Sequence, residues 1–358
     1  MPRQLRVGIV GCGVVAQIIH TPTLRELPEL FRITALCDVS PSVLAAVGAE
    51  HPDAALHEDA TDLVRSSDVD VVLVANPHVY HAEVALMAMA AGKHVLVEKP
   101  MCITLNEADQ LLSAEEKAGV IVQVGYMRRY APAFVEAVKR TAGLRDEIIL
   151  ARVHDVIGPN ATIIDSTSRL HRATDIDPGT VAAAKAFLAE QTRHAIGEVP
   201  EPLSVAYGLL LGLCSHDVSA MRELIGMPKG VLYAAQRRGG RMITAAFDYG
   251  GFVCQFESGV DSIAQFDAHL EVYTRGQRLR VDYDTPFVRH LPARLTVTGG
   301  VDPAGVSVET RFATRNDSFV AEWRAFHANI TGGTRPKTSI EDARNDLILF
   351  KEMVARMA

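Results

Sequence analysis

The stretch RVGIVGCGVVAQIIH (6–20) constrains the fold of this chain more than any other part of it. Its apolar run ends at a GCG turn, residues 11–13, and a helical pattern begins directly afterwards. Ala16 stands where a third glycine is common, and the next apolar run, RITALCD (32–38), ends in an aspartate. Strand, glycine turn, helix and strand in this order predict a βαβ unit whose first turn brings backbone close to a ligand.

The same stretch has the basic start and apolar core of a secretory signal, with Arg3 and Arg6 near its beginning. Three glycines and Gln17 interrupt that core, and no small-x-small cleavage site follows before the helical pattern. Cleavage would also remove the first strand of the βαβ unit. We therefore interpret the stretch as part of a folded domain.

The glycine spacing indicates a dinucleotide site. Gly11 allows a tight turn, Gly13 lets the backbone approach a pyrophosphate at the helix N-terminus, and Ala16 permits close helix–strand packing. Asp38 lies 25 residues after Gly13, near the ~20 expected for the ribose-binding acid. A carboxylate there accepts hydrogen bonds from the ribose hydroxyls and repels a 2′-phosphate, so we expect NAD rather than NADP.

The first 125 residues alternate short β-rich runs with helical patterns, which is typical of βαβ units. Helices are expected at 81–92 and 105–119, each ending at a glycine. Further strands, near-continuously apolar as in a sheet covered on both faces, are expected at residues 69–76, 93–99 and 120–126. We predict an α/β Rossmann domain with a doubly wound parallel sheet over residues 1–125.

The pattern changes past residue 145, where strands follow one another without helices between them. They are expected at residues 147–158, 242–250, 251–259 and 269–284, with hairpin turns at 250–251 and 275–276. We predict an α+β domain with a large open, mostly antiparallel sheet over residues 126–358. Two helices are expected at the C-terminal end of this domain, and the last of these helices can pack back on the first domain. Residues 159–207 fit neither pattern, and long connections of this kind are usually functional or bind partners.

Composition excludes several partners. The formal net charge is −7, from 36 basic and 43 acidic residues, so we expect no nucleic acid. The apolar run LLLGLC (209–214) is too short for a membrane helix. Five scattered cysteines without a CxxC pair indicate buried or free thiols and a cytoplasmic protein. His78 and His81 lack an acidic or cysteine partner at ligand spacing, so we expect no metal.

A second motif, NPHVYHAEVALMAMAAGKHVLVEKPM (76–101), resembles that of the Gfo/Idh/MocA family of sugar and cyclitol oxidoreductases. The order of GxGxxA, acid, NP…H, AGKHVLVEKP and GYMRRYAPAF (125–134) extends the resemblance over most of the N-terminal half. The carboxyl half fits in layout. The resemblance implies an NAD(P)-dependent dehydrogenase or reductase that transfers hydride between nicotinamide and a sugar, sugar derivative or cyclitol.

The resemblance also assigns residues. Lys99 of the EKP segment would polarise the reacting oxygen, the alternative being a lysine that caps a strand end at the surface. Glu98 would line the cofactor side, and Pro100 would fix the turn that presents Lys99. The expected cofactor-binding residues are Gly11, Gly13, Val14, Val15, Asp38, Asn76, Pro77, His81, Glu98 and Lys99.

The family's acid or base comes from a D-x-x-x-H segment at a helix start, matched here by LLGLCSHDVSAMRELIG (210–226). His216 falls at the family histidine, with a histidine that plays no chemical part as the alternative. Gly212 replaces the family aspartate. Asp155, Asp165 or a residue of 159–207 could supply the missing carboxylate.

We also state expectations for residues that lie near His216 or elsewhere around the predicted site. The side chain of Asp217 should point away from that of His216 on a helix. Arg128 and Arg129 either shape the substrate cleft, together with Asp155, or are surface charges. Trp323, the single tryptophan, is expected in the core or an interface.

Two other functions stay open because of Gly212: an NAD- or sugar-binding regulator without turnover, and an NAD-dependent glycosidase. The resemblance further implies a homodimer or homotetramer that associates through the open face of the second sheet. Residues 251–259 look apolar enough to need such covering.

Overall fold

The computed structural model describes residues 3–300, 305–312 and 317–357, which fall into two compact units. The break expected after residue 125 is also a break between these units, and two later segments join the first unit. The last helix, α12 (Ile340–Met357), is divided between them. The first unit comprises Met1–Gly125, Ser168–Gly197 and Glu322–Leu347, and the second Tyr126–Thr167, Glu198–Ala321 and Ile348–Ala358.

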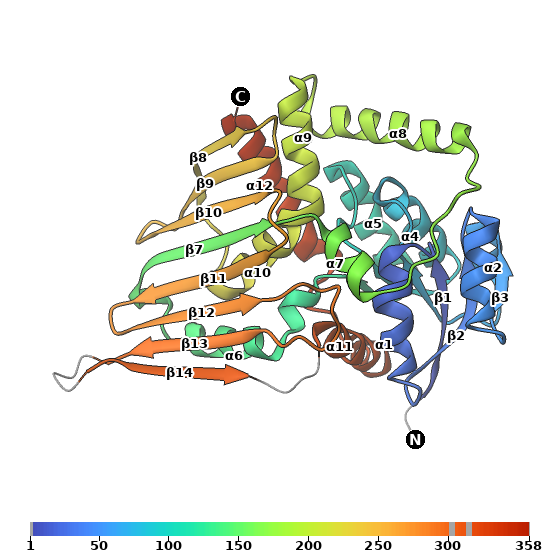
Figure 1. Ribbon diagram of the computed structural model, residues 1–358, viewed down its shortest axis with the longest axis horizontal. Coiled ribbons are helices and arrows are strands. Elements are labelled where there is room, and N and C mark those ends of the chain that lie inside the picture. The colour runs from blue at the N-terminus through green and yellow to red at the C-terminus, as the bar shows by residue number, and fades with distance from the viewer. Residues whose placement is uncertain (1–2, 301–304, 313–316, 358) are drawn as a thin grey trace. The chain divides into compact units, whose positions relative to one another are not determined.

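The first unit is built on a six-stranded parallel sheet with the order β3-β2-β1-β4-β5-β6 (Figure 1). This is the order of a doubly wound Rossmann sheet, as predicted. Nearly all residues of the central strands are buried because helices cover both faces. The strands are β1 (Leu5–Val10), β2 (Phe31–Cys37), β3 (Ala55–His57), β4 (Val71–Val74), β5 (His94–Val97) and β6 (Val122–Val124).

Local sequence explains the helices of this unit. The helix α5 begins with a capping box between Thr104 and Glu107 and ends at Gly119, whose φ of 63° lies in the left-handed region. The α2 helix is capped by the Ser40 side chain. The helical segments are the π-turn η1 (Ala16–His20), α1 (Thr21–Arg25), α2 (Pro41–Ala49), α3 (Ala60–Arg65), η2 (His78–Tyr80), α4 (His81–Ala90), α5 (Leu105–Ala118) and α8 (Pro178–Ile196).

The second unit is built on an eight-stranded sheet with the order β14-β13-β12-β11-β7-β10-β9-β8 (Figure 1). Only the β7–β10 pair is parallel, so the sheet is mostly antiparallel, as predicted. The segment 269–284 is a hairpin, β11–β12, that turns at residues 275–276. The strands are β7 (Ile148–Ile157), β8 (Gly230–Arg237), β9 (Met242–Asp248), β10 (Val253–Val260), β11 (Phe266–Thr274), β12 (Gln277–Tyr283), β13 (Arg294–Gly299) and β14 (Ser307–Phe312).

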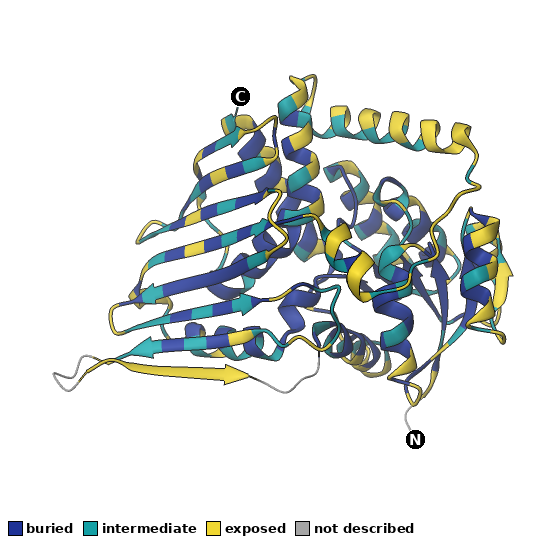
Figure 2. Ribbon diagram, viewed as in Figure 1, coloured by how far each residue is buried: buried dark blue, intermediate teal, exposed yellow. Residues whose placement is uncertain are grey.

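The two faces of this second sheet differ, and Figure 2 shows buried and more exposed residues alternating along its strands. On β10, Cys254 and Phe256 are buried, at 0% and 1% exposed, while Gln255 between them is exposed. The Cys254 thiol lies 3.7 Å from the sulfur of Met221 on α10 (Ser215–Ile225). The expectation that residues 251–259 leave apolar surface to be covered by a partner is therefore wrong, because a helix of the same unit covers it.

The helix that carries His216 does not begin there. Three segments, α9 (Glu201–Leu209), the π-turn η5 (Leu210–Cys214) and α10, form one helical run, Glu201–Ile225. The expected helix start at His216 is therefore corrected, because a π-turn lets the helix continue through Gly212. By length and composition this run could cross a membrane, which the short LLLGLC stretch did not suggest. Its most apolar window is 67% buried inside the structure, and a buried core helix passes the same test.

The long excursion 159–207 contains α7 (Asn160–Thr167), an irregular segment and α8. The α8 helix has no fully buried residue and is drawn mostly in the exposed colour in Figure 2. The remaining helical segments are η3 (Met127–Tyr130), α6 (Pro132–Ala142), η4 (Arg145–Glu147) and α11 (Ser318–Gly332).

All five cysteines are buried and none is in a disulfide, as expected. Burial raises the pKa of every one of these thiols, that of Cys12 to about 12. The thiols are therefore protonated at neutral pH and shielded from reagents.

Candidate active site

The turn after β1 contains two glycines, and a different physical reason explains glycine at each position. Gly11 has a φ of 95°, and a Cβ there would lie 2.4 Å from the backbone nitrogen of Asn76, so no larger residue fits. Gly13 is exposed, and a Cβ there would meet nothing within 4 Å. Packing inside the chain therefore does not explain Gly13, whereas approach of the backbone to a pyrophosphate does.

The Asp38 carboxylate is fixed by two backbone N–H groups at the carboxyl end of β2. Its Oδ2 accepts from Cys12 N at 2.8 Å, and its Oδ1 accepts from Ser40 N at 2.8 Å. Each oxygen keeps a lone pair for a further donor. Asp38 therefore lies beside the glycine turn, with lone pairs left for further donors.

The ends of β4 and β5 are joined through His81, which is 2% exposed. Its Nε2 lies 2.9 Å from the carbonyl oxygen of Asn76, and its Nδ1 lies 2.8 Å from that of Pro100. Burial lowers the pKa of His81. Since both ring nitrogens face carbonyl oxygens, His81 positions the two strand ends. Within the described ranges, no group of three or more His, Cys, Asp and Glu side chains is arranged to hold a metal ion.

Asn76 supplies a further sign of a ligand. Its side-chain Oδ1 is buried and has no hydrogen-bond partner among the described residues. Buried polar atoms are rarely left unpaired, so this oxygen fits the N–H donor of a bound group. Together with Gly13 and Asp38, it makes the carboxyl edge of the sheet fit an adenine dinucleotide.

Glu98, from the EKP segment, is held by a relay that the sequence did not predict. The indole N–H of Trp323 donates to His20 Nδ1 at 3.0 Å, so the ring proton is on Nε2, which donates to Glu98 Oε1 at 2.8 Å. Burial alone would raise the pKa of Glu98, but the His20 hydrogen bond and the charge of Lys99 hold it below its ordinary value. Glu98 is therefore a carboxylate at neutral pH.

Lys99 follows directly and is half-buried, which does not match the alternative of a freely exposed strand cap. Its backbone N–H donates to Glu98 Oε2 at 3.2 Å, and its peptide bond to Pro100 is cis. Because β4 and β5 are parallel neighbours, the Asn76 and Lys99 segments lie at the same edge of the sheet.

In the second unit, Arg128 lies in a buried cluster. Its Nη1 donates to Asp155 Oδ2 at 3.0 Å and to Asp217 Oδ1 at 2.5 Å, and all three side chains are at most 3% exposed. The guanidinium also lies over the ring of Tyr283, 5.2 Å from its centroid. Burial would lower the pKa of Arg128, but the two carboxylates raise it above its ordinary value. One cation therefore faces two buried carboxylates.

The second arginine of the RR pair is also buried. Arg129 Nε donates to Glu223 Oε2 at 2.6 Å, and the Arg129 side chain is 4% exposed. The surface-charge alternative is therefore wrong for both arginines. Trp323 is fully buried, as expected of a core residue.

His216 is 8% exposed, and its ring lies edge-on to that of Tyr126, with centroids 6.4 Å apart. Asp217 points to Arg128, in agreement with the expectation that it diverges from His216. Gly212 is exposed, and a Cβ there would meet nothing within 4 Å. Steric crowding therefore does not explain the loss of the family aspartate. Of the residues expected to replace it, Asp155 is bound to Arg128, and Asp165 is exposed on α7.

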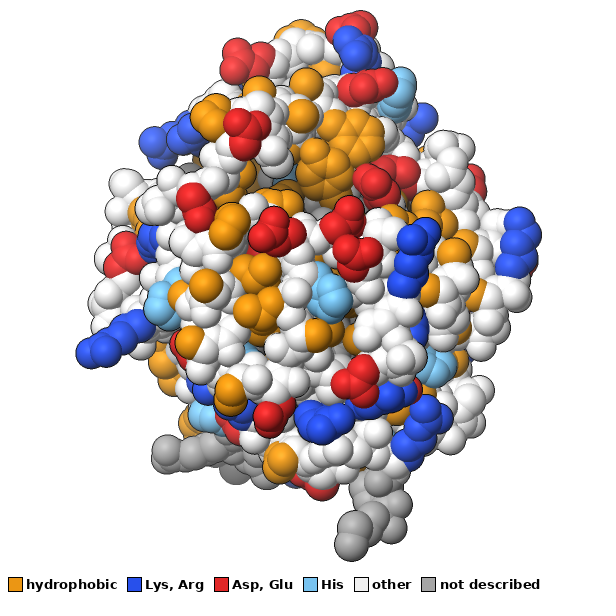
Figure 3. All heavy atoms as spheres, turned by 90° about the vertical axis from the view of Figure 1, so that its right-hand side faces the viewer, with side chains coloured by type: hydrophobic (Ala, Val, Ile, Leu, Met, Phe, Trp, Pro, Cys, Tyr) orange, Lys and Arg blue, Asp and Glu red, His pale blue; other side chains and the backbone are white. Residues whose placement is uncertain are grey.

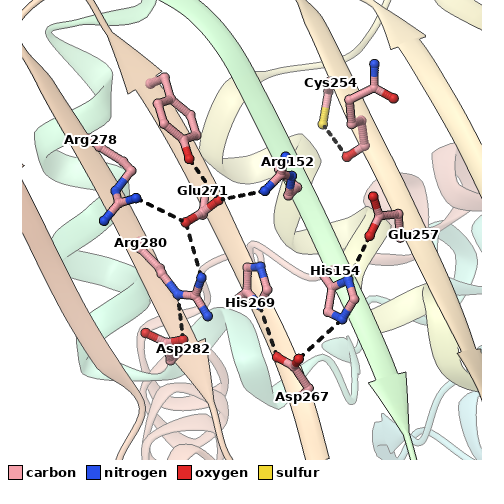
Figure 4. Close-up of polar contacts among 12 residues, drawn as sticks. Arg152, His154, Cys254, Glu257, Asp267, His269, Glu271, Arg278, Arg280 and Asp282 are labelled. Atoms are coloured by element: carbon pink, nitrogen blue, oxygen red, sulfur yellow. Dashed lines mark hydrogen bonds and ion pairs between the residues drawn. The ribbon is translucent and has the colours of Figure 1, made fainter.

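The open face of the second sheet carries a charged network (Figure 4). The Glu271 carboxylate lies 3.2 Å from Arg280 Nη1 and is 3% exposed in its side chain. The rings of His154 and His269 stack with centroids 4.9 Å apart, and Asp267 lies within 3.4 Å of both. A partner on this face would meet charged and hydrogen-bonding groups.

Residues 5–126 match the family described as "Oxidoreductase family, NAD-binding Rossmann fold". The chain is 38% identical over 140 residues to inositol 2-dehydrogenase of Paracoccus denitrificans, an alignment that spans 38% of this chain and 41% of that protein. Fold and glycine turn thus define an NAD-binding Rossmann protein. Residues 5–126 thus match the Gfo/Idh/MocA family of oxidoreductases, and the chain covers less than half of the length of this inositol dehydrogenase.

Solved structures share the fold over nearly the whole chain. Levoglucosan dehydrogenase, in complex with NADH and levoglucosan, is 17% identical with a TM-score of 0.76, and the match covers 99% of this chain and 97% of that one. KijD10, a 3-ketoreductase from Actinomadura kijaniata in complex with NADP and TDP-benzene, is 21% identical with a TM-score of 0.75, over 99% and 98%. These likenesses extend the shared fold to the second unit.

Proposed function

We propose that this protein is an NAD(P)-dependent dehydrogenase or reductase that transfers hydride between nicotinamide and a hydroxyl or keto carbon of a sugar, sugar derivative or cyclitol. The observation that carries the proposal is the Glu98–Lys99 turn, anchored by His20 at the edge of the dinucleotide-binding sheet. The names of the relatives, an inositol dehydrogenase and a levoglucosan dehydrogenase, support the substrate class.

In this proposal the first unit binds and orients the cofactor. Gly11 and Gly13 bring the backbone to the pyrophosphate, Asp38 accepts from the ribose, and Asn76 Oδ1 accepts from the nicotinamide end. The nicotinamide ring supplies the hydride chemistry when bound. The Lys99 ammonium donates to the reacting substrate oxygen and stabilises the negative charge that develops on it. The glycine-turn neighbours Val14 and Val15, together with Pro77, His81 and Glu98, complete the cofactor side.

The second unit supplies the proton acceptor in this proposal. His216 accepts the hydroxyl proton during oxidation and returns it during reduction. Arg128, Arg129 and Asp155 act as positioning residues, since their charges are already used in ion pairs within the unit. A bound sugar would meet the open position at Gly212 instead of an aspartate.

We also propose that the protein prefers NAD, forms a homodimer or homotetramer and is located in the cytoplasm. The fixed carboxylate of Asp38 favours NAD over NADP. The charged open face of the second sheet fits a homodimer or homotetramer whose copies pair ionic groups. A cytoplasmic location fits the five reduced thiols. We propose no nucleic-acid partner, since the net charge is −7 and acidic and basic side chains are intermixed on the face drawn in Figure 3.

The test is NADH formation with NAD and NADP in parallel, over a panel of sugars, sugar acids and inositols. Lys99→Ala should lower kcat by about 10²–10³-fold, and His216→Ala by about 10²–10⁴-fold, while calorimetry shows NAD binding retained. Lys117→Ala, an exposed lysine on α5, is the matched control and should keep full turnover.

Three outcomes would contradict the proposal or one of its parts. Tight NAD binding without turnover on the panel would favour the regulator, or a glycosidase if sugar is released without net NADH. If the protein bound neither nucleotide, the proposed dinucleotide site would be wrong. Full turnover in His216→Ala would mean that another group accepts the proton.

A further inference from the structure

Residues 171–175, which we call the strap, cross the first unit between the helix after the glycine turn and α2. Figure 1 draws them as part of the green trace leading toward α8. The Gln17 side chain holds one end, since its Nε2 donates to the His171 carbonyl at 2.9 Å and its Oε1 accepts from His171 N at 2.9 Å. The same Nε2 donates to the carbonyl of Cys12 in the glycine turn at 2.7 Å.

The other end of the strap is the Asp175 side chain. Its Oδ1 accepts from Ser40 Oγ at 2.5 Å and from Ser42 Oγ at 2.8 Å, and its Oδ2 accepts from Ser42 N at 2.8 Å. These hydrogen bonds, that from Ser40 foremost, lower the pKa of Asp175. A charged carboxylate therefore occupies the hydroxyl and N–H donors at the start of α2.

Ser40 joins this carboxylate to the ribose-binding acid. Its backbone N–H donates to Asp38, and its hydroxyl donates to Asp175. In dinucleotide-binding sheets the acid after the second strand binds the ribose 2′-hydroxyl, the oxygen that carries the extra phosphate of NADP. A 2′-phosphate next to Asp38 would therefore need the donors that Asp175 already occupies, and would face two carboxylates instead of one.

We propose that Asp175 is a cofactor-selectivity residue: it holds the strap against Ser40 and Ser42, fills the place of a 2′-phosphate with the protein's own carboxylate and excludes NADP. This inference rests on the proposed dinucleotide-dependent function and adds a residue from the excursion 159–207. Asp38 and Asp175 then act together on one position, the first by accepting from the ribose and the second by repelling the phosphate.

The test is calorimetric binding to the full chain of NAD and NADP, with AMP and adenosine 2′,5′-bisphosphate as probes that lack nicotinamide. Asp175→Asn keeps an oxygen that can accept from Ser42 N but removes the charge. It should tighten NADP binding about tenfold or more, because a dianion no longer meets a second carboxylate, and change NAD binding less than about threefold. The change in affinity for adenosine 2′,5′-bisphosphate should match the change for NADP, and the change for AMP should match the change for NAD.

Two controls separate charge from other effects. Asp177→Asn removes the same charge two residues further on, where the side chain caps α8 by accepting from Thr180 N, and should leave both affinities unchanged. In the wild type, the preference for NAD should shrink as salt concentration rises, and this dependence should weaken in Asp175→Asn.

An unchanged ratio of NADP to NAD affinity in Asp175→Asn and Asp175→Ala would overturn the selectivity role and leave the proposed dehydrogenase function standing. Tighter binding of NADP than NAD by the wild type would also overturn it. Binding of neither nucleotide by the wild type would overturn both proposals.

Discussion

Two buried polar clusters, one in each unit, hold their charged groups in different ways. In the first unit, one carboxylate, Glu98, receives its hydrogen bond from His20, which in turn accepts one from Trp323. In the second unit, one cation, Arg128, faces two carboxylates. Each cluster adjoins a π-turn, η1 before the first and η5 before the second, and such turns are frequent at functional sites. The comparison teaches that a single buried carboxylate is held by hydrogen bonds in the first unit, whereas two buried carboxylates share one arginine in the second.

The largest effect is expected from removing the cation of the second cluster. Arg128→Leu leaves Asp155 and Asp217 buried against an apolar side chain and should lower the free energy of unfolding by about 3–5 kcal/mol. Urea denaturation measures it, with Arg140→Leu as the control. Arg140 makes partly exposed ion pairs, worth about 0–1 kcal/mol. Replacing all three cluster residues by Leu removes every buried charge and should recover much of the loss. Equal losses in Arg128→Leu and Arg140→Leu would contradict the comparison.

A smaller effect is expected from the hydrogen bond between Trp323 and His20. Trp323→Phe removes the donor to His20 and should cost about 1–3 kcal/mol, since a buried ring nitrogen is left without its hydrogen bond. Phe326→Leu is the matched control for lost volume, because Phe326 is also fully buried and lies 5.9 Å from the Trp323 ring. If both variants melted alike and both kept the same pH dependence, the hydrogen bond would contribute nothing beyond packing.

The pH dependence of the first cluster follows from the lowered pKa of Glu98. A carboxylate whose folded pKa lies below its unfolded value of 4.5 stabilises the protein above that pH, and this stabilisation is lost as pH falls through the folded pKa. Melting temperatures of the wild type and Glu98→Gln should therefore differ most at neutral pH and converge in acid. A constant difference across the whole range would show that Glu98 titrates alike in both states.

The smallest effect on stability is expected at the open position of the second unit. Gly212→Asp places a carboxylate one helical turn before His216, where a Cβ meets no other atom, and should change stability by less than about 1 kcal/mol. We expect kcat to rise a few-fold, about the size of a modest improvement in proton transfer, with a shifted pH profile. An unchanged pH profile would place Gly212 outside the path of the proton, and Gly208→Asp, one turn earlier, is the control.

Sequence reasoning predicted the features that are determined by residues close together in the chain. The glycine turn, Asp38 and the EKP segment all lie within single strand–loop–helix motifs, so their place at the sheet edge followed from local order. The relay between His20 and Trp323 joins residues 303 positions apart, and the strap joins Ser40 to a residue 135 positions away. No local pattern reports such pairs, although the single tryptophan was a usable signal for a buried anchor.

The sequence analysis missed four strands, β3, β8, β13 and β14, and for β14 and β3 the cause is related. The β14 strand, SVETRF, is exposed along its whole length, so no alternation of buried apolar residues marked it. The short β3 strand, ALH, has no fully buried residue. The helix start expected at His216 was wrong because η5 absorbs an extra residue and lets the helix pass through a glycine.

Because all five natural thiols are buried, position 212 is suited to an introduced cysteine that carries a fluorescent reporter. A cysteine introduced there would be exposed, while the natural ones are shielded and protonated. A maleimide dye would then label the protein at one position, beside the histidine proposed to move the proton. Its fluorescence would follow the arrival of a sugar directly, without any turnover.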